Sequence, residues 1–419
     1  MSDILKINKI NKKKNEVKYE YEFTGLWNRY MNVDENMYIR YETSIEDVPD
    51  ELLIIPFICN ILPICWVFNL EIYVDTLDED FYNCIDKIKE GYQNMYPQIK
   101  MKGNIIVKNI KTNKINGTNA ISLFSGGVDA FNTLINNIDR KPILLTIWGA
   151  DVDINNNEAW ERVKKFNDET ATKLNLKNTY VKSNFRKMIN DINLCNDISK
   201  YNKSWSWWHE FQHGIGVLGH TAPLAYLYNV DTIFIASSFT KNDIYTCASD
   251  PTIDNKLKFA GCKVIHDGYE YSRINKVHNI CKFVNDKLNG KLMLRVCWKS
   301  DSGENCCNCE KCYRTILEII SEKNEIQNYG FSLSIKQRKK MIRDTKFLVK
   351  YTNGYLLSFY KEIQNNILKN YSKEDTPKDL LWLRNIKIKE NKPSIIIFYG
   401  KAIRKVQRGL YKVNRKLGK

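Results

Sequence analysis

From Ala120 onward the chain alternates short apolar runs with amphipathic segments, and this alternation limits the fold more than any other feature of the sequence. The apolar runs have the length of buried strands, and the segments between them have the apolar spacing of helices. The runs are AISLF, ILLTIW, NTYVKS and TIFIASS, with KVIHD and LMLRV as weaker strand candidates. We therefore expect an α/β fold with a Rossmann-like parallel sheet, helices on both faces, and ligands at the carboxyl ends of the strands.

The segments on either side of this alternation differ in character. Residues 1–117 combine strand-like runs with one helical pattern and predict an α+β domain. Residues 118–330 hold the strand–helix alternation, and residues 331–419 are helical and basic. A chain of 419 residues is long enough for such a division into several parts.

One stretch, Leu52 to Leu70, is apolar and about long enough to span a membrane. Two prolines and an asparagine interrupt it, and the strand-like EIYVD follows at once. We therefore favour a buried helix that leads into a strand. The N-terminal sequence has charges but no apolar core of a signal peptide, which predicts a cytoplasmic protein. In that compartment the 12 cysteines are expected to be metal ligands or reduced core residues.

A candidate phosphate loop follows the first of the apolar runs. Ser125, Gly126 and Gly127 stand between the strand and a helix that begins near Val128 and Asp129. Glycines let the backbone approach an anion closely, and the helix N-terminus offers N–H groups and a positive dipole end. Asp129 is placed to cap the helix or to help hold Mg²⁺. An ordinary strand–turn–helix corner would read the same way.

Four cysteines form a C-x8-C-x2-C-x2-C array, with Cys297, Cys306, Cys309 and Cys312 as the four members. Paired C-x2-C spacing lets two thiolates reach one tetrahedral zinc ion from a tight turn, and four ligands leave no open position. The array therefore predicts a structural Zn²⁺ site, with an iron–sulfur cluster as the alternative. Cys307 is an additional neighbouring thiol.

Together these motifs resemble a known family. SGGVDA is similar to the SGGxDS signature of the PP-loop (N-type ATP pyrophosphatase) superfamily, and the cysteine array followed by Arg314 resembles the 7-cyano-7-deazaguanine synthases (the QueC family). The resemblance covers about residues 120–320. It implies a ligase that binds ATP and Mg²⁺, cleaves ATP between the α and β phosphates, and activates a small acid as an acyl-adenylate. A nitrogen nucleophile then displaces AMP to form an amide or a nitrile.

The sequence also departs from that family. Ala130 stands where the family has Ser, Trp148-Gly149-Ala150 replaces Tyr-Gly-Gln, and the substrate motif is only loosely represented by residues 248–251. We infer shared chemistry and leave the substrate open. A descendant that binds nucleotide without catalysis is a further alternative, because Ala130 removes a donor.

Several polar and aromatic residues are candidates for the pocket, because they lie near expected strand ends or in the stretch that lines the substrate pocket of the resembled family. Aromatic rings suit a planar ring or a sugar face, and Arg273 is a weaker candidate for binding phosphate or carboxylate. The catalytic candidates are His209, His213 and Asp243, and the substrate candidates are Trp205, Trp208, Ser237, Lys241, Asp250 and Arg314.

Two other functions compete with the ligase. His209-Glu210-Phe211-Gln212-His213 spells HExxH, the helix of zinc metalloproteases. The third histidine of the metzincin extension would fall at 219, where the chain has Gly, and the motif lies within the strand–helix alternation. The net charge of +16 and the cysteines suggest a tRNA-modifying PP-loop enzyme.

Residues 401–419 carry eight positive charges and no acid, with apolar residues at helical spacing. Such a helix binds an anionic membrane surface, which would place the protein at the inner face of the membrane, or packs on the protein. Nucleic acid is a less favoured partner, because only Tyr411 could stack on a base.

Overall fold

The computed structural model describes residues 3–243, 245–297, 302–389 and 392–399. The chain divides into two compact units, one of residues Met1–Glu270 with Asp301–Gly303 and the other of Tyr271–Ser300 with Glu304–Lys419. These units do not coincide with the three sequence segments 1–117, 118–330 and 331–419. The tail at 401–419, for which we expect an amphipathic helix, lies outside the described residues.

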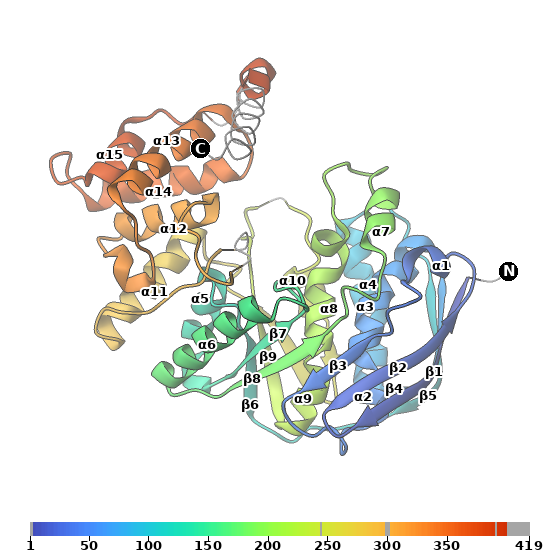
Figure 1. The fold of residues 1–419 in the computed structure, drawn as a ribbon. Coiled ribbons are helices and arrows are strands. Elements are labelled where there is room, and N and C mark those ends of the chain that lie inside the picture. The colour runs from blue at the N-terminus through green and yellow to red at the C-terminus, as the bar shows by residue number, and fades with distance from the viewer. Residues whose placement is uncertain (1–2, 244, 298–301, 390–391, 400–419) are drawn as a thin grey trace. The chain divides into compact units, whose positions relative to one another are not determined.

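The first unit is built on one 11-stranded sheet of order β10-β11-β9-β6-β7-β8-β3-β2-β1-β4-β5 (Figure 1). Its N-terminal strands are β1 (Ile4–Lys13), β2 (Glu16–Phe23), β3 (Tyr38–Tyr41), β4 (Glu71–Asp78) and β5 (Asn104–Lys111). The remaining strands are β6 (Asn119–Leu123), β7 (Ile143–Trp148), β8 (Asn178–Ser183), β9 (Val230–Ala236), β10 (Lys258–Phe259) and β11 (Cys262–Asp267). The fold is therefore α/β with a mostly parallel sheet, as the strand–helix alternation predicts.

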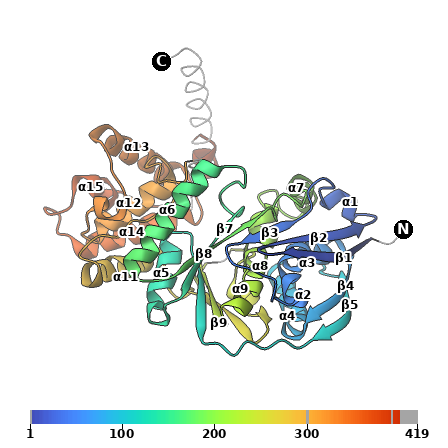
Figure 2. The same cartoon turned by 60° about the horizontal axis from the view of Figure 1, so that its bottom comes forward.

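Strands β8, β7, β6, β9 and β11 are parallel neighbours. The antiparallel pairing of β3 with β8, in which Tyr41 lies opposite Val181, joins them to the N-terminal strands. Helices α5 and α6 lie on one face of the parallel strands and α8 and α9 on the other (Figures 1 and 2). This arrangement follows from right-handed crossovers that run first in one direction and then back across the sheet.

The helices of the first unit fall into an N-terminal and a later group. The N-terminal ones are α1 (Trp27–Tyr30), α2 (Asp50–Leu53), α3 (Ile55–Phe68) and α4 (Glu79–Met95). The later ones are α5 (Val128–Asn136), η1 (Ile138–Arg140), α6 (Asn157–Leu174), α7 (Asp191–Ile198), η2 (Trp208–Gln212), α8 (His213–Gly219), α9 (Ala222–Leu227) and α10 (Pro251–Asp254).

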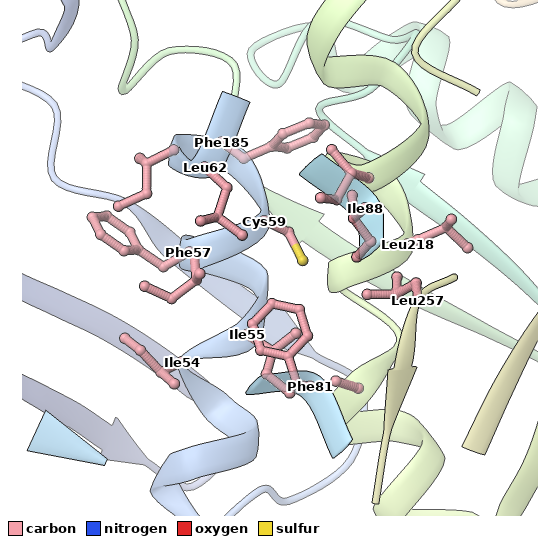
Figure 3. Close-up of a cluster of buried hydrophobic side chains, with 14 of the residues drawn as sticks. Ile54, Ile55, Phe57, Cys59, Leu62, Phe81, Ile88, Phe185, Leu218 and Leu257 are labelled. Carbon is pink, nitrogen blue, oxygen red and sulfur yellow. The ribbon is translucent and has the colours of Figure 1, made fainter. Parts of the chain in front are cut away.

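Helix α3, in the apolar stretch 52–70, is the centre of the core. It is 14 residues long and leads into β4, as the favoured interpretation of that stretch predicts. Side chains from α4, from α8 and from the loops around Phe185 and Leu257 surround it (Figure 3). Helix α8 comes close because Gly219 faces Cys59, where an added Cβ would lie 2.7 Å from the cysteine Cβ. No helix in the described part of the chain is both long and apolar enough to cross a membrane.

The named elements of the second unit are all helices, joined by irregular segments. Its elements are α11 (Arg273–Lys287), α12 (Glu310–Ser321), η3 (Ile326–Tyr329), α13 (Ile335–Tyr351), α14 (Leu356–Asn370) and α15 (Lys378–Asn385). The prediction of a strand at LMLRV, residues 292–296, is wrong. The N–H groups of Leu292 and Leu294 instead donate to the carbonyls of Asn328 and Tyr329, at 2.9 and 3.0 Å, beside the short helix η3.

Candidate functional site

The parallel strands bring the expected pocket segments to one edge of the sheet. Counted along the chain, β6, β7, β8, β9 and β11 have the spatial order 3-2-1-4-5 of a Rossmann-like sheet. The direction of the crossovers reverses between β6 and β9, and ligands of such sheets bind outside the carboxyl ends of the strands at that switch point. The loops that begin at Phe124 and Ser237 leave the sheet there.

The candidate phosphate loop has the backbone of an anion cradle. Gly126 has a φ of +75°, a conformation that glycine adopts without strain. Gly127 is the N-cap of α5, and its N–H donates to Ser125 Oγ at 3.4 Å. Val128, which is buried, and the partly exposed Asp129 form the first turn of α5, whose N–H groups point toward the loop. Ala130 is buried in the same turn.

A cavity of about 240 Å³ lies at the adjoining ends of β7 and β8. Its lining comprises Gly149, Ala150, Asp151, Asp153, Ile154, Ser183, Asn184, Arg186, Lys187, Asp191 and Gln212. Arg186 donates to the carbonyl of Ala150 at 2.7 Å, and its guanidinium stands 4.3 Å from the ring centroid of Trp208. Lys187 forms an ion pair with Asp153 at 3.1 Å. A cation held over an aromatic ring beside a cavity suits an acid or phosphate ligand.

In the aromatic segment before α8, Trp205 packs against the core and Trp208 lies beside the cavity. Trp205 packs edge-on against Tyr96, with ring centroids 5.2 Å apart. Trp208 begins the π-helical turn η2 and contacts His213 edge-on at 5.0 Å. Burial lowers the pKa of His213, so this histidine is neutral and packed at neutral pH. Trp208, one of the expected substrate residues, contacts Arg186, which lines the cavity.

His209 is paired with the acid next to it. Its Nδ1 lies 2.9 Å from Glu210 Oε1. Thr246 donates to Glu210 Oε2 at 2.7 Å, and Tyr96 donates to the same oxygen at 3.1 Å. Cys247 and then Glu210 raise the pKa of His209 to about 10. Glu210 is thus held on three sides and is not poised as the base of a zinc protease.

His220, the histidine nearest to the expected metzincin position, belongs to the core. It hydrogen-bonds the carbonyl of Gly216 at 2.7 Å and Ser183 Oγ at 3.0 Å, and burial lowers its pKa to about 4. In the described ranges, the one group of three or more candidate metal ligands is the four-cysteine cluster. The arrangement therefore gives no support to the metalloprotease alternative.

In the loop after β9 the expected pocket residues have local roles. Ser237 is buried and donates from Oγ to the carbonyl of Phe239 at 2.6 Å. Asp243 accepts from the backbone N–H of Thr240 at 2.7 Å, and Asp250 caps α10 by accepting from Thr252 N at 2.9 Å. The exposed Lys241 is tied by its backbone N–H to the carbonyl of Tyr269 at 3.2 Å.

The four cysteines meet in the second unit. All four sulfur atoms lie within 4.8 Å of one another, with Cys297 and Cys309 3.8 Å apart and Cys306 and Cys312 3.9 Å apart. Sulfur atoms bound at about 2.3 Å to one tetrahedral ion are spaced by about 3.8 Å. An iron–sulfur cluster binds the four cysteines through two or four iron atoms and so spreads the set further apart. The cluster fits a single metal ion such as zinc.

The local sequence explains how the cysteines converge. Cys309 is the N-cap of α12, which puts Cys312 in the first turn. Cys307 has a φ of +47°, and this tight turn lets the N–H of Asn308 donate to Cys306 Sγ at 3.4 Å. Asn305 Oδ1 accepts from the N–H of Cys297 at 3.3 Å and so holds the fourth ligand in place. Cys307 itself is not a member of the cluster.

The two arginines expected to bind an acid are buried in the helical unit. Arg314 forms an ion pair with Glu310 at 3.4 Å and stacks over Phe359 at 4.0 Å. Arg273 pairs with the buried Glu318 at 3.4 Å. These contacts are those of an internal network that links α11, α12 and α14.

Sequence reasoning did not identify Arg186, which lines the cavity, or Cys247, which lies beside His209. Arg186 follows β8 directly, so its position after a strand was a usable signal. Cys247 has no such signal, because only folding brings residues 209 and 247 together through a hydrogen bond from Ala248 N to the carbonyl of His209, at 2.8 Å. Comparison with models of known protein families finds no match for this chain, and a search of curated proteins finds none either.

Proposed function

We propose that this protein is an ATP-dependent enzyme of the PP-loop type that converts ATP to AMP and pyrophosphate while it activates a small acid. The observation that carries the proposal is the position of Ser125-Gly126-Gly127 at the switch point of a 3-2-1-4-5 sheet. A glycine-containing turn followed by a helix N-terminus at that point suits a pyrophosphate group. The sequence resemblance to the QueC family supplies the reaction class.

The residues around the loop suggest a division of tasks. The N–H groups at the start of α5 would bind phosphate oxygens, and Asp129 would help hold Mg²⁺ there. Arg186, stacked on Trp208 at the cavity, would bind the carboxylate of the acid. Catalysis would then consist of bringing the carboxylate to the α-phosphate and of stabilising the charge that develops on the phosphates.

We further propose that the four-cysteine cluster binds Zn²⁺ and has a structural role. Its four thiolates fill a tetrahedral coordination shell and leave no position for a substrate. Metal binding would hold the segment around Cys297 to the start of α12.

The test is to identify the nucleotide products. Purified protein is incubated with ATP, Mg²⁺ and a panel of small carboxylic acids, and AMP, ADP and pyrophosphate are separated and quantified. We expect pyrophosphate and AMP in equal amounts with at least one acid, and loss of both with Arg186→Met. Lys182→Met is the matched control, because Lys182 is also stacked on a tryptophan, Trp148, but does not line the cavity. Production of ADP and phosphate would overturn the proposal.

A further inference from the structure

We propose that Cys247, His209 and Glu210 form a nucleophilic site in which Cys247 accepts an acyl group as a thioester. The proposal rests on the proposed function for the source of that group, an acid activated by ATP at the same edge of the sheet. It assigns a covalent role to a cysteine outside the four-cysteine cluster. The ligand class is the carbonyl carbon of an activated small acid.

Hydrogen bonds hold the segment around Cys247 close to His209 and Glu210. The residues on both sides of Cys247 are tied to the histidine–acid pair: Thr246 donates to Glu210 Oε2 at 2.7 Å, and Ala248 N donates to the carbonyl of His209 at 2.8 Å. Cys247 N donates to Met95 Sδ at 3.3 Å, which fixes the backbone of the cysteine. The backbone of Cys247 is thus held near the histidine–acid pair by the hydrogen bonds of its two chain neighbours.

The order of contacts is that of a nucleophile, a base and an orienting acid. His209 interacts with the side chains of both Cys247 and Glu210, and its Nδ1 lies 2.9 Å from Glu210 Oε1. Glu210 is itself oriented by Tyr96 and Thr246. Such a chain holds the imidazole in one tautomer and one orientation, which is what activation of a thiol requires.

Exposure fits a site that admits a small molecule. The His209 side chain is 47% exposed, whereas Glu210 is 7% exposed. Cys247 is 7% exposed, so the thiol lies just below the surface beside an accessible imidazole. The π-helical turn Trp208–Gln212 places His209 and Glu210 here, and such turns occur often at functional sites.

The charges around the site favour an imidazolium. His209 has its pKa raised to about 10, by Cys247 first and by Glu210 second. Near it are Tyr92 on α4 and Tyr96 at the C-cap of that helix, whose pKa values burial raises, and the partly buried His213, whose pKa burial lowers. None of these three is charged at neutral pH. A positive imidazole beside a thiol stabilises negative charge on sulfur.

The chemical step is balanced without an oxidant or a reductant. The Cys247 thiolate attacks the carbonyl carbon of the acyl-adenylate, a C–S bond forms, and the bond between that carbon and the phosphate oxygen breaks. AMP leaves with the electron pair of that bond. A nitrogen nucleophile later forms a C–N bond, the C–S bond breaks to restore the thiolate, and the proton of the nucleophile passes to solvent.

The test uses an activated acyl probe and no ATP, so its result is independent of the proposed function. The full chain is mixed with p-nitrophenyl acetate, release of p-nitrophenolate is followed, and the acetylated residue is located by mass spectrometry. We expect a burst of about one p-nitrophenolate per chain and a hydroxylamine-sensitive acetyl group on Cys247. The burst should vanish in Cys247→Ser and slow about tenfold in His209→Gln and Glu210→Gln.

A second measurement guards against variants that fail to fold. In the wild-type protein, iodoacetamide labelling at pH 7 should modify Cys247 about tenfold faster than Cys195. Cys195 is the matched control, because it is more exposed but has its pKa raised by burial and no histidine partner in the described hydrogen bonds. A burst that survives Cys247→Ser, or labelling of Cys247 no faster than that of Cys195, would overturn the proposal.

Discussion

The candidate phosphate loop, Ser125-Gly126-Gly127, and the four-cysteine cluster both stand at the start of a helix, but their geometries suit different kinds of ligand. Gly127 caps α5, so the N–H groups of its first turn face the loop at the carboxyl ends of the strands. Cys309 caps α12 and turns its sulfur toward three others within 4.8 Å. The first arrangement suits a ligand that binds and leaves, and the second suits an ion that belongs to the fold.

This contrast predicts that loss of the metal is the largest single perturbation. Cys309→Ser should release the metal and unfold the segment around α12, because structural Zn²⁺ contributes roughly 10–16 kcal/mol of apparent binding free energy. Bound metal and hydrogen exchange of residues 310–321 measure the effect. Cys307→Ser is the control and should keep the metal, since Cys307 lies outside the cluster. Equal metal loss in Cys309→Ser and Cys307→Ser would show that the four-cysteine cluster is not the specific metal site.

A substitution in the candidate phosphate loop should have the opposite result, with a large loss of activity and little change in the fold. Gly126→Ala should lower ATP turnover at least about 100-fold, because a Cβ strains the φ of +75° and displaces the N–H donors. Gly290→Ala has the same backbone strain, at a φ of +77°, with open space around it. It should leave turnover unchanged. Bound metal should stay at the wild-type level in both variants, and a loss in Gly126→Ala would link the two regions.

The core of the first unit combines apolar packing around α3 with buried hydrogen bonds. Asn60, buried in α3, accepts from Gln212 Nε2 at 2.8 Å and donates to the carbonyl of Pro56 at 2.8 Å. Asn60→Leu should lower the free energy of unfolding by about 1–3 kcal/mol, because it leaves the buried Gln212 amide without its acceptor. Urea unfolding measures this. The exposed Asn28→Leu should change it by no more than about 0.5 kcal/mol.

The smallest expected effect separates a helix cap from a substrate residue. Asp250→Ala should lower the free energy of unfolding by about 1 kcal/mol, because α10 loses its N-cap, and Asp250→Ser should restore most of it. Neither change should alter the KM of the activated acid once that acid is known. A raised KM in both variants would show that Asp250 contributes to substrate binding and is not only a helix cap.

The sequence predicted best where local pattern decides. ILLTIW coincides with β7, because buried parallel strands are short apolar runs bounded by turns. NTYVKS, which is more polar, coincides with β8. Strand β1 went unrecognised, since lysines and asparagines on its exposed face mask the alternation of Leu5 and Ile7. LMLRV has the composition of a strand but lacks a neighbouring strand to pair with.

Long-range contacts account for what the sequence could not predict at the candidate site. The spacing of Cys297, Cys306, Cys309 and Cys312 predicts their convergence, because three of them lie within one turn and a helix start. Nothing in the sequence around Cys247 indicates that it would meet His209. For Arg186 the position just after a strand is a usable signal, but its contact with Trp208 depends on how the loop after β8 packs against η2.

The antiparallel pairing of β3 with β8 determines whether the first unit can be shortened. If the chain began after residue 117, β8 would become a bare edge, with the N–H and C=O groups that now pair with Ile39 and Tyr41 open to other chains. Helix α8 would lose α3, the apolar partner for which its glycines make room. Such a fragment should aggregate. The N-terminal strands therefore cover the edge of the sheet at β8, and they cannot be removed without exposing it.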